Sequence, residues 1–159
     1  RDSSVTGVQT CALPICASHD EVVAGVESDC TDSMIAFSVD TLEFLERGGR
    51  INSVAAKLGG ALQVKPILHL VNGVIERRDL VRTGARAFTR LVDIAMNAYE
   101  PGCPIAVHHV ADPASATMLA QALTSRLGVA DIPVSECGAV IATHTGPGAL
   151  AVVVGPQAR

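Results

Sequence analysis

The chain has 159 residues, 48% of them hydrophobic and 18% charged, which is enough for one ordinary domain with a substantial core. Its formal net charge of −4 argues against a nucleic-acid partner, because phosphate binding normally leaves a basic surface. The longest apolar runs, such as residues 149–154, are far shorter than the ~18 residues of a membrane-spanning helix. We therefore expect a soluble protein that does not span a membrane.

The first sixteen residues differ in character from the rest of the chain. Residues 1–16 show neither helical nor strand periodicity, and they lack the basic start and apolar centre of a signal peptide. Within them, residues 5–15 (VTGVQTCALPI) resemble a translated sequencing-adaptor sequence. We interpret residues 1–16 as non-native.

Cysteine and histidine positions give little sign of a metal site. The five cysteines have the spacing of neither a zinc ribbon nor a disulfide framework, which favours a reducing compartment and hence the cytoplasm. His108 and His109 are neighbours on an expected strand, so their side chains point to opposite faces and cannot readily share an ion. We therefore expect neither a metal site nor a cofactor.

Short elements are expected before residue 60. Ser18 and Glu21 have the spacing of a capping box, which marks a helix start. Asp40 and Glu43 repeat that spacing after an apolar run, and two glycines follow at the expected helix end. The expected elements are a helix over residues 18–29, a strand over 34–39, a helix over 41–47 and a helix over about 53–58.

A hairpin is the most strongly indicated local structure. Asn72 and Gly73 tolerate the positive φ angles of a tight turn, and they separate apolar strands over residues 64–71 and 74–81. Pro66 has no amide donor, so we expect the first of these strands at an edge of the sheet.

Two longer helices and three further strands follow. Apolar residues between Thr83 and Tyr99 recur at helical spacing. Asp112 and Pro113 are typical of a helix start, and Gly128 is typical of a helix end. Strands are expected over residues 105–110, 132–135 and 149–154. This order predicts an α+β fold in which helices pack on a largely antiparallel sheet.

The segment THTGPG at residues 143–148 is the sharpest local motif. Its hydroxyls, imidazole and glycine amides could bind a carboxylate or phosphoryl oxygen. A turn in which glycine and proline only set backbone angles would have the same sequence. Arg50, after two glycines, could likewise bind a phosphoryl group as a rigid donor fork or pair with a surface carboxylate. The basic stripe of Arg82, Arg86 and Arg90 is typical of a solvated helix face.

Enzymatic chemistry has only weak signals. Cys137 and His144 could act as nucleophile and base, but no third group is indicated that would orient them. The chain contains neither a P-loop nor a GxGxxG motif. A hydrolase or phosphotransferase that uses His144 as acid or base stays open as an alternative.

Four segments together resemble the DegV family of bacterial lipid-binding proteins, over about residues 18–154. They are VDTLEFLERGGRI at 39–51, LGGALQVKPILHLVNG at 58–73, VRTGARA at 81–87 and GAVIATHTGPGAL at 138–150. The resemblance implies a carrier, not an enzyme, that holds one long-chain fatty acid in a tunnel between two domains. It also implies that a separate ATP-dependent fatty acid kinase phosphorylates the carboxylate in some members.

The resemblance assigns roles to individual residues. It implies that His144 and Thr145 bind the fatty-acid carboxylate or its hydrogen-bond network. It places Arg50 and Arg82 around the phosphotransfer site or the docked kinase, where fixed cations stabilise phosphoryl charge. Apolar residues within 58–70 would line part of the tunnel.

The resemblance also implies that this chain is a carboxy-terminal fragment of the two-domain fold. We expect non-native residues at 1–16, a remnant helix of the amino-terminal domain at 17–32, the DegV-like carboxy-terminal domain at 33–155 and a tail at 156–159. Lipid binding would then be impaired in the truncated chain. An inert fragment that exposes an apolar face is a further alternative.

Overall fold

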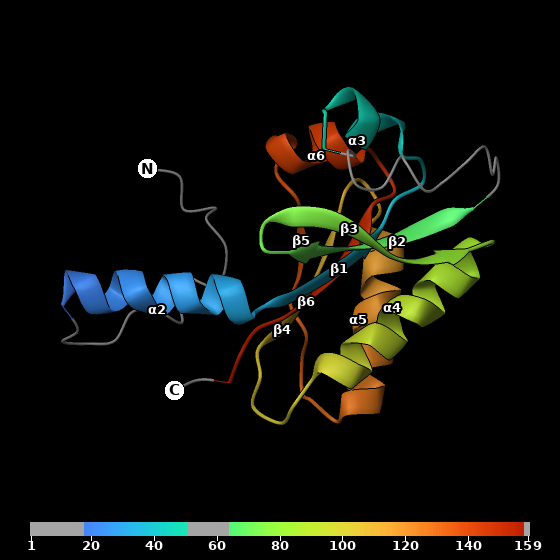
Figure 1. Cartoon of the computed structure of the whole chain (residues 1–159). Coiled ribbons are helices and arrows are strands. Elements are labelled where there is room, and N and C mark those ends of the chain that lie inside the picture. Colours follow the sequence, from blue (N-terminus) through green and yellow to red (C-terminus); the bar gives the residue numbers. More distant parts are fainter. Residues whose placement is uncertain (1–17, 51–63, 158–159) are drawn as a thin grey trace.

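A six-stranded sheet forms the centre of the computed structural model, which describes residues 18–50 and 64–157 (Figure 1). The strand order is β3-β2-β1-β6-β4-β5, and every neighbouring pair is antiparallel except β4 and β5. The strands are β1 Met34–Ser38, β2 Lys65–Val71, β3 Val74–Val81, β4 Ile105–His109, β5 Val134–Glu136 and β6 Leu150–Val154. The predicted α+β class with a largely antiparallel sheet is confirmed.

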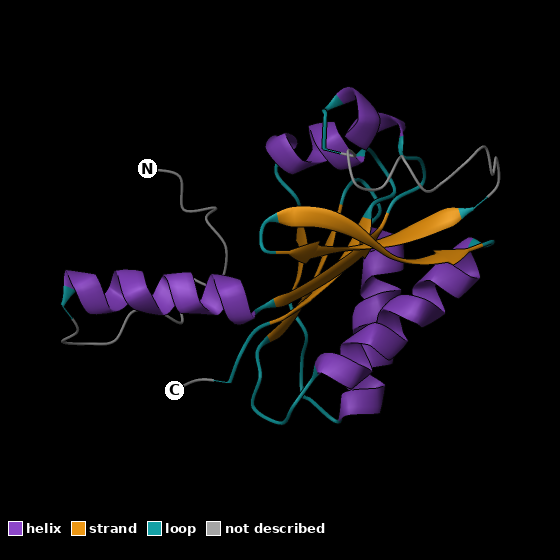
Figure 2. Ribbon diagram, in the orientation of Figure 1, coloured by secondary structure: helices purple, strands orange, loops and turns teal. Residues whose placement is uncertain are grey.

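Five helices accompany the sheet in the described residues (Figure 2). Helices α4 and α5 cover one face, which we call the first face, while α3 and α6 lie at one end of the second face. The helices are α2 His19–Asp32, α3 Glu43–Arg47, α4 Gly84–Ala98, α5 Pro113–Leu127 and α6 Ala139–Thr145.

The main core lies between the first face and helices α4 and α5. Leu91 and Leu123 are fully buried there, against Val107 and Val152 of the central strands. Both helices predicted for this part of the chain, between Thr83 and Tyr99 and between Asp112 and Gly128, are present. Thr83 Oγ1 accepts a hydrogen bond from Arg86 N at 3.2 Å, and α5 ends at Gly128 with φ of 69°.

A smaller cluster lies between the second face and the two short helices. Its buried members are Phe37, Val39, Leu45, Leu68, Val110 and Ala149. They come from β1, β2, helix α3 and the residues that adjoin the ends of β1, β4 and β6. Because Leu45 of α3 belongs to the cluster and Ala142 of α6 packs against it, the cluster holds both helices over one end of the sheet.

The predicted hairpin is confirmed, whereas the predicted edge position of its first strand is wrong. Asn72 has φ of 51° and Gly73 has φ of 77°, as the tight turn requires. Strand β2 lies between β1 and β3, and β3 is the edge strand. Pro66 has no backbone N–H to donate, and the sheet tolerates this because the pairing with β1 begins only at Ile67. Pro66 therefore pairs with β3 alone.

Helix α2 projects from the sheet and has no buried residue (Figure 1). The predicted capping box is present: Glu21 Oε2 accepts from Ser18 N at 2.8 Å, and Ser18 Oγ accepts from Glu21 N. The helix continues to Asp32, three residues beyond the prediction. Among the described residues, none of the helices combines the length and the apolar character that crossing a membrane requires.

Three other expectations have different outcomes. Asp40 does not cap α3, whose N-cap is Leu42 without a side-chain bond, because Asp40 pairs with Lys65 instead. Strand β5 begins at Val134, and Ile132 is buried in the core just before it. The helix expected over residues 53–58 lies outside the described residues.

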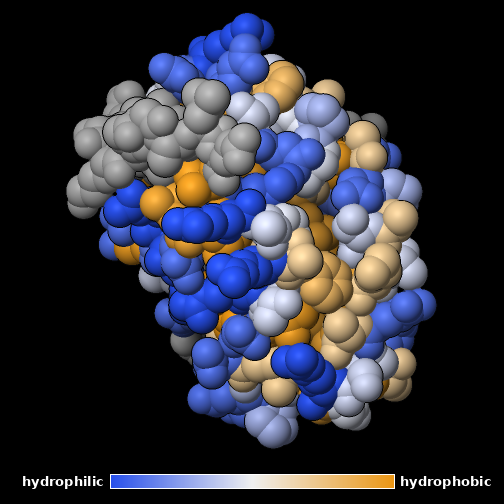
Figure 3. Space-filling view, turned by 90° about the vertical axis from the view of Figure 1, so that its right-hand side faces the viewer, coloured by the Kyte–Doolittle hydropathy of each residue, from blue (hydrophilic) through white to orange (hydrophobic). Residues whose placement is uncertain are grey.

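Hydrophilic side chains form a band on the side of the molecule shown in Figure 3. Arg82 and Arg86 are exposed near the start of α4, and Arg90 Nε donates to Asp79 Oδ2 at 2.8 Å. The predicted basic stripe of Arg82, Arg86 and Arg90 therefore contains two solvated arginines and one arginine in a half-exposed ion pair with β3. Ion pairs of this kind contribute little to stability.

Candidate functional site

The two glycine-rich motifs meet where helix α3 packs on helix α6. The segment at residues 143–148, for which the sequence allowed a glycine-rich turn, is a turn only in its second half, because Thr143, His144 and Thr145 form the last turn of α6. Both threonine hydroxyls donate to carbonyls four residues earlier, which lets them stay inside a helix. Residues 146–149 then connect α6 to β6.

His144 packs directly on Gly48, at the end of α3. A Cβ atom built on Gly48 would overlap His144 Nδ1 and lie 2.9 Å from Cε1. The Nδ1 atom is buried, and it has no hydrogen-bond partner among the residues that the structure describes. The GGR and HTGPG motifs are therefore in contact although almost a hundred residues separate them.

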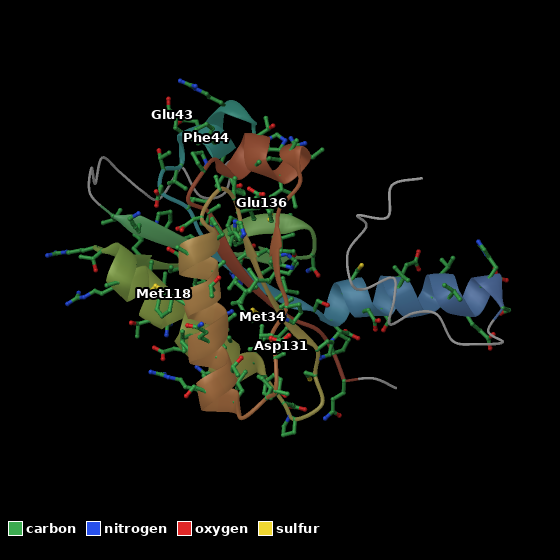
Figure 4. All side chains as sticks on the ribbon, turned by 180° about the vertical axis from the view of Figure 1, so that it is seen from behind. Met34, Glu43, Phe44, Met118, Asp131 and Glu136 are labelled. Carbon is green, nitrogen blue, oxygen red and sulfur yellow. The ribbon has the colours of Figure 1, made fainter. Side chains whose placement is uncertain are left out.

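Two further glycines of this segment contact side chains at the start of the α3 region. A Cβ on Gly146 would overlap the Phe44 ring, and one on Gly148 would lie 2.5 Å from Asp40 Oδ2. Figure 4 shows Phe44 between α3 and α6. We call these contacts, together with the one between Gly48 and His144, the glycine interface.

Thr145 is buried, with 8% of its surface exposed. Its hydroxyl donates to the Ile141 carbonyl at 3.0 Å, so the proton that a carboxylate would accept is already engaged. A ligand at this residue has to compete with that intrahelical bond, or accept from the hydroxyl after it rotates.

Arg50 and Arg82 lie at the same end of the sheet, and both are exposed. Arg50 Nη1 donates to the Gly48 carbonyl at 3.3 Å, which places this arginine next to the seat of His144. Arg82 follows the last residue of β3, whose partner in β2 is Lys65.

Lys65 and Asp40 form an ion pair that the sequence pattern does not predict. The sequence places Lys65 in a strand and assigns Asp40 to a helix cap. The Lys65 side chain is about one-third exposed, and its Cε is 4.0 Å from a Cβ position on Gly84 at the start of α4. The signal available in the sequence was a charged residue that opens a buried strand.

The paired histidines point to opposite faces, as predicted. His109 is buried toward the first face, and its Nδ1 accepts from Asp112 N at 3.3 Å. His108 lies on the second face, 2.8 Å from the Ser135 hydroxyl. Burial lowers the pKa of His108 below its usual 6.5, and the nearby His109 lowers it further. Among the described residues, no three His, Cys, Asp or Glu side chains are grouped to hold a metal ion.

Cys137 does not have the surroundings of an activated nucleophile. Burial raises the pKa of its thiol, and the Glu136 carboxylate raises it further. A thiol in that environment stays protonated and nucleophilically weak. The Nδ1 atom of His144, the base considered for this pair, is covered by Gly48, so that nitrogen is not available to take the thiol proton.

A family model described as an uncharacterised protein of the DegV family matches residues 16–157. The chain belongs to the DegV family. It is similar to a DegV domain-containing protein of Streptomyces coelicolor, at 45% identity over 94% of this chain and 58% of the relative. It is also similar to the protein DegV of Bacillus subtilis, at 33% identity over 86% of this chain and 49% of the relative. This DegV chain thus spans about half the length of the curated relatives that it matches.

Solved DegV structures have the same fold. A fatty-acid-binding DegV family protein from Streptococcus agalactiae matches with a TM-score of 0.78 and 31% identity, over 88% of this chain and 50% of that one. A DegV family protein from Thermus thermophilus, solved in a study of fatty acid binding, matches with a TM-score of 0.77 and 35% identity, over 89% and 52%. The resemblance noted in the sequence is therefore confirmed.

Proposed function

We propose that the protein carrying this chain binds a long-chain fatty acid and presents its carboxylate to an ATP-dependent fatty acid kinase. The observation that carries the proposal is the likeness, at 31% and 35% identity, to two DegV structures reported with fatty acid binding. It acts in this proposal as a carrier subunit in the bacterial cytoplasm, and the chain described here is the carboxy-terminal domain of a two-domain protein.

The head-group end of the proposed site is the glycine interface. His144 and Thr145 lie at the carboxyl end of α6, beside the connection to β6. A ring N–H of His144 and the hydroxyl of Thr145 are donors that suit a carboxylate, and hydrogen bonds to a charged acceptor are stronger than neutral ones.

The acyl chain is proposed to lie along the second face of the sheet. Ile35, Val153 and Ala106 form one row across β1, β6 and β4 there, since each faces the next in the strand register. All three are half-buried and belong to neither core cluster. This apolar row lies toward the strand ends that point away from the glycine interface, so a long acyl chain could run from that interface along the face. Burying such surface against a lipid chain is favourable.

The structure shows which residues of β2, the strand beside β1, belong to the main core and which lie on the second face. The sequence pattern alone does not distinguish the two. Ile67 points to the main core under α4, whereas Leu68 points to the second face. The tunnel lining expected within residues 58–70 therefore reduces here to alternate residues of β2, and residues 58–63 lie outside the described part of the chain.

Arg50 and Arg82 are proposed to face the kinase or the phosphoryl group. Both are exposed at the end of the sheet that carries the glycine interface, so each can reach a docked partner. Their guanidinium groups would stabilise charge that develops on the transferred phosphoryl group.

Denaturing mass spectrometry of the protein at its natural length tests the proposal. We expect a long-chain fatty acid to copurify in near one-to-one amount, and replacing His144 by Ala to lower its occupancy. Thr143→Val is the matched control, because Thr143 occupies the same helical turn, is exposed and bonds only within α6. Purified protein that carries no lipid and takes up no added palmitate would rule the proposal out.

A further inference from the structure

Gly48 has a backbone conformation that does not require glycine. Its φ of −77° and ψ of −3° lie in the right-handed helical region, which every residue type adopts. The space is what requires glycine here, because a Cβ would overlap the His144 ring. Gly146 and Gly148 differ in this respect, since their φ values of 75° and 79° favour glycine by themselves.

The His144 ring is covered at Nδ1 and cannot easily move away. Nδ1 is buried without a hydrogen-bond partner among the described residues. The segment that follows the ring is held against the α3 region at two more points, Phe44 on Gly146 and Asp40 on Gly148. The contact residues are spaced by four on one side and by two on the other, so the two segments run past each other in opposite directions.

A covered nitrogen without a partner restricts where the ring proton sits. A buried N–H without an acceptor is rarer in proteins than an acceptor that lacks a donor. The arrangement at Nδ1 therefore favours a lone pair there, and the neutral ring then carries its proton on Nε2.

We propose that Gly48 is a positioning residue that seats His144 as a fixed Nε2–H donor. This inference rests on the proposed function, because it makes the ring a donor to the fatty-acid carboxylate at the glycine interface. A fixed N–H donor can hydrogen-bond to a carboxylate, which accepts hydrogen bonds. It cannot hydrogen-bond to an ammonium head group, which only donates them. The same seating excludes His144 Nδ1 from proton transfer and so disfavours a hydrolase that uses it.

Nuclear magnetic resonance of the full-length, lipid-free protein reads the ring directly. Long-range couplings between ring nitrogens and carbon-bound protons report the tautomer, and we expect Nε2–H for His144 in the wild type and in Gly138→Ala. Gly138 is the matched control, because it caps α6 and a Cβ there meets no atom within 4 Å. A wild-type ring protonated on Nδ1 overturns the proposal, whatever the variants do.

A double-mutant cycle tests the contact through stability. We expect Gly48→Ala to lower the thermal midpoint clearly, and to lower it much less in a His144→Ala background where the ring is gone. Equal losses in both backgrounds would place the cost elsewhere and overturn the contact. Because this cycle needs only unfolding curves, a Gly48→Ala protein too unstable for spectroscopy still gives an answer.

Ligand discrimination completes the test and separates the two proposals. We expect the wild type to prefer palmitate to hexadecylamine, and Gly48→Ala to lose about tenfold of that preference, the worth of one hydrogen bond to a charged group. A wild type that binds neither refutes the proposed function while the ring measurement still stands. If Gly48→Ala changes neither palmitate binding nor the ring signal of His144, this inference is overturned and the proposed function stands.

Discussion

His108 shows how the position of one side chain on the sheet sets its chemistry. It lies half-buried on the second face against Ser135, whereas its neighbour His109 is buried on the other face. Burial lowers the pKa of His108, so the folded protein binds this proton less readily than the unfolded chain does. Stability is therefore complete above the usual value of 6.5 and falls as the pH drops below it.

We predict that His108→Gln reduces the acid sensitivity of the fold. Glutamine can still bond to Ser135 but cannot take up a proton in this range. The midpoint of urea unfolding at about pH 7.5 and about pH 5.5 measures the effect, and the wild type should lose more stability between them than the variant. An equal loss in both proteins would assign the acid sensitivity to other groups.

Arg82 allows a test of the division of roles at the proposed site. We predict that Arg82→Ala leaves the bound fatty acid in place and slows phosphorylation by the kinase partner, because the side chain is exposed and outside both apolar clusters. Lipid occupancy by mass spectrometry and acyl-phosphate formation are measured on the same preparation. Lost lipid with normal phosphorylation per bound lipid would contradict the assignment. Arg86→Ala, which removes another exposed arginine in the first turn of α4, is the control.

At the scale of elements, α5 illustrates how one helix divides into core and surface. Leu123 is fully buried against the first face, while Met118, five residues earlier, is 60% exposed (Figure 4). We predict that Leu123→Ala costs about 2–5 kcal/mol of unfolding free energy, because it removes packed atoms and leaves a cavity. Met118→Ala should change it by less than about 0.5 kcal/mol. Denaturant unfolding of both variants is the measurement, and similar losses would mean that α5 does not pack as described.

The short elements at the glycine interface depended on contacts that local sequence does not contain. The glycine and proline residues of the segment at residues 143–148 favour a turn, yet residues 143–145 complete helix α6, which packs against α3. Asp40 was read as a cap, but its carboxylate binds Lys65 from a strand that follows 25 residues later. Local preference is weak in such short segments, so tertiary contacts decide their conformation.

At the scale of the molecule, α2 stands apart from the sheet and helices. It has no buried residue, and its capping box supplies local stability only. We predict that a chain starting at Ser33 unfolds with a thermal midpoint within a few degrees of the longer chain, because few packed atoms are lost. A large drop measured by circular dichroism would show that α2 belongs to this domain, against the expectation that residues 17–32 belong to an amino-terminal domain.

The sequence by itself determined the elements whose signals are local. The turn at Asn72 and Gly73 and the limits of α5 at Asp112 and Gly128 each follow from one or two residues with a required backbone angle or cap. Helix α4 follows from the helical spacing of its apolar residues. The four motifs were likewise sufficient for the DegV family, which the family model confirmed.

Only the tertiary structure decided how those pieces combine. Strand order is set by pairing between distant segments, which is why β2 is internal despite Pro66. The contact of Gly48 with His144 joins residues that are almost a hundred positions apart, and no periodicity encodes it. Burial and hydrogen bonding at a site depend on which surfaces meet. The packing of His144 on Gly48 is therefore decided by how α3 and α6 contact each other in the folded chain.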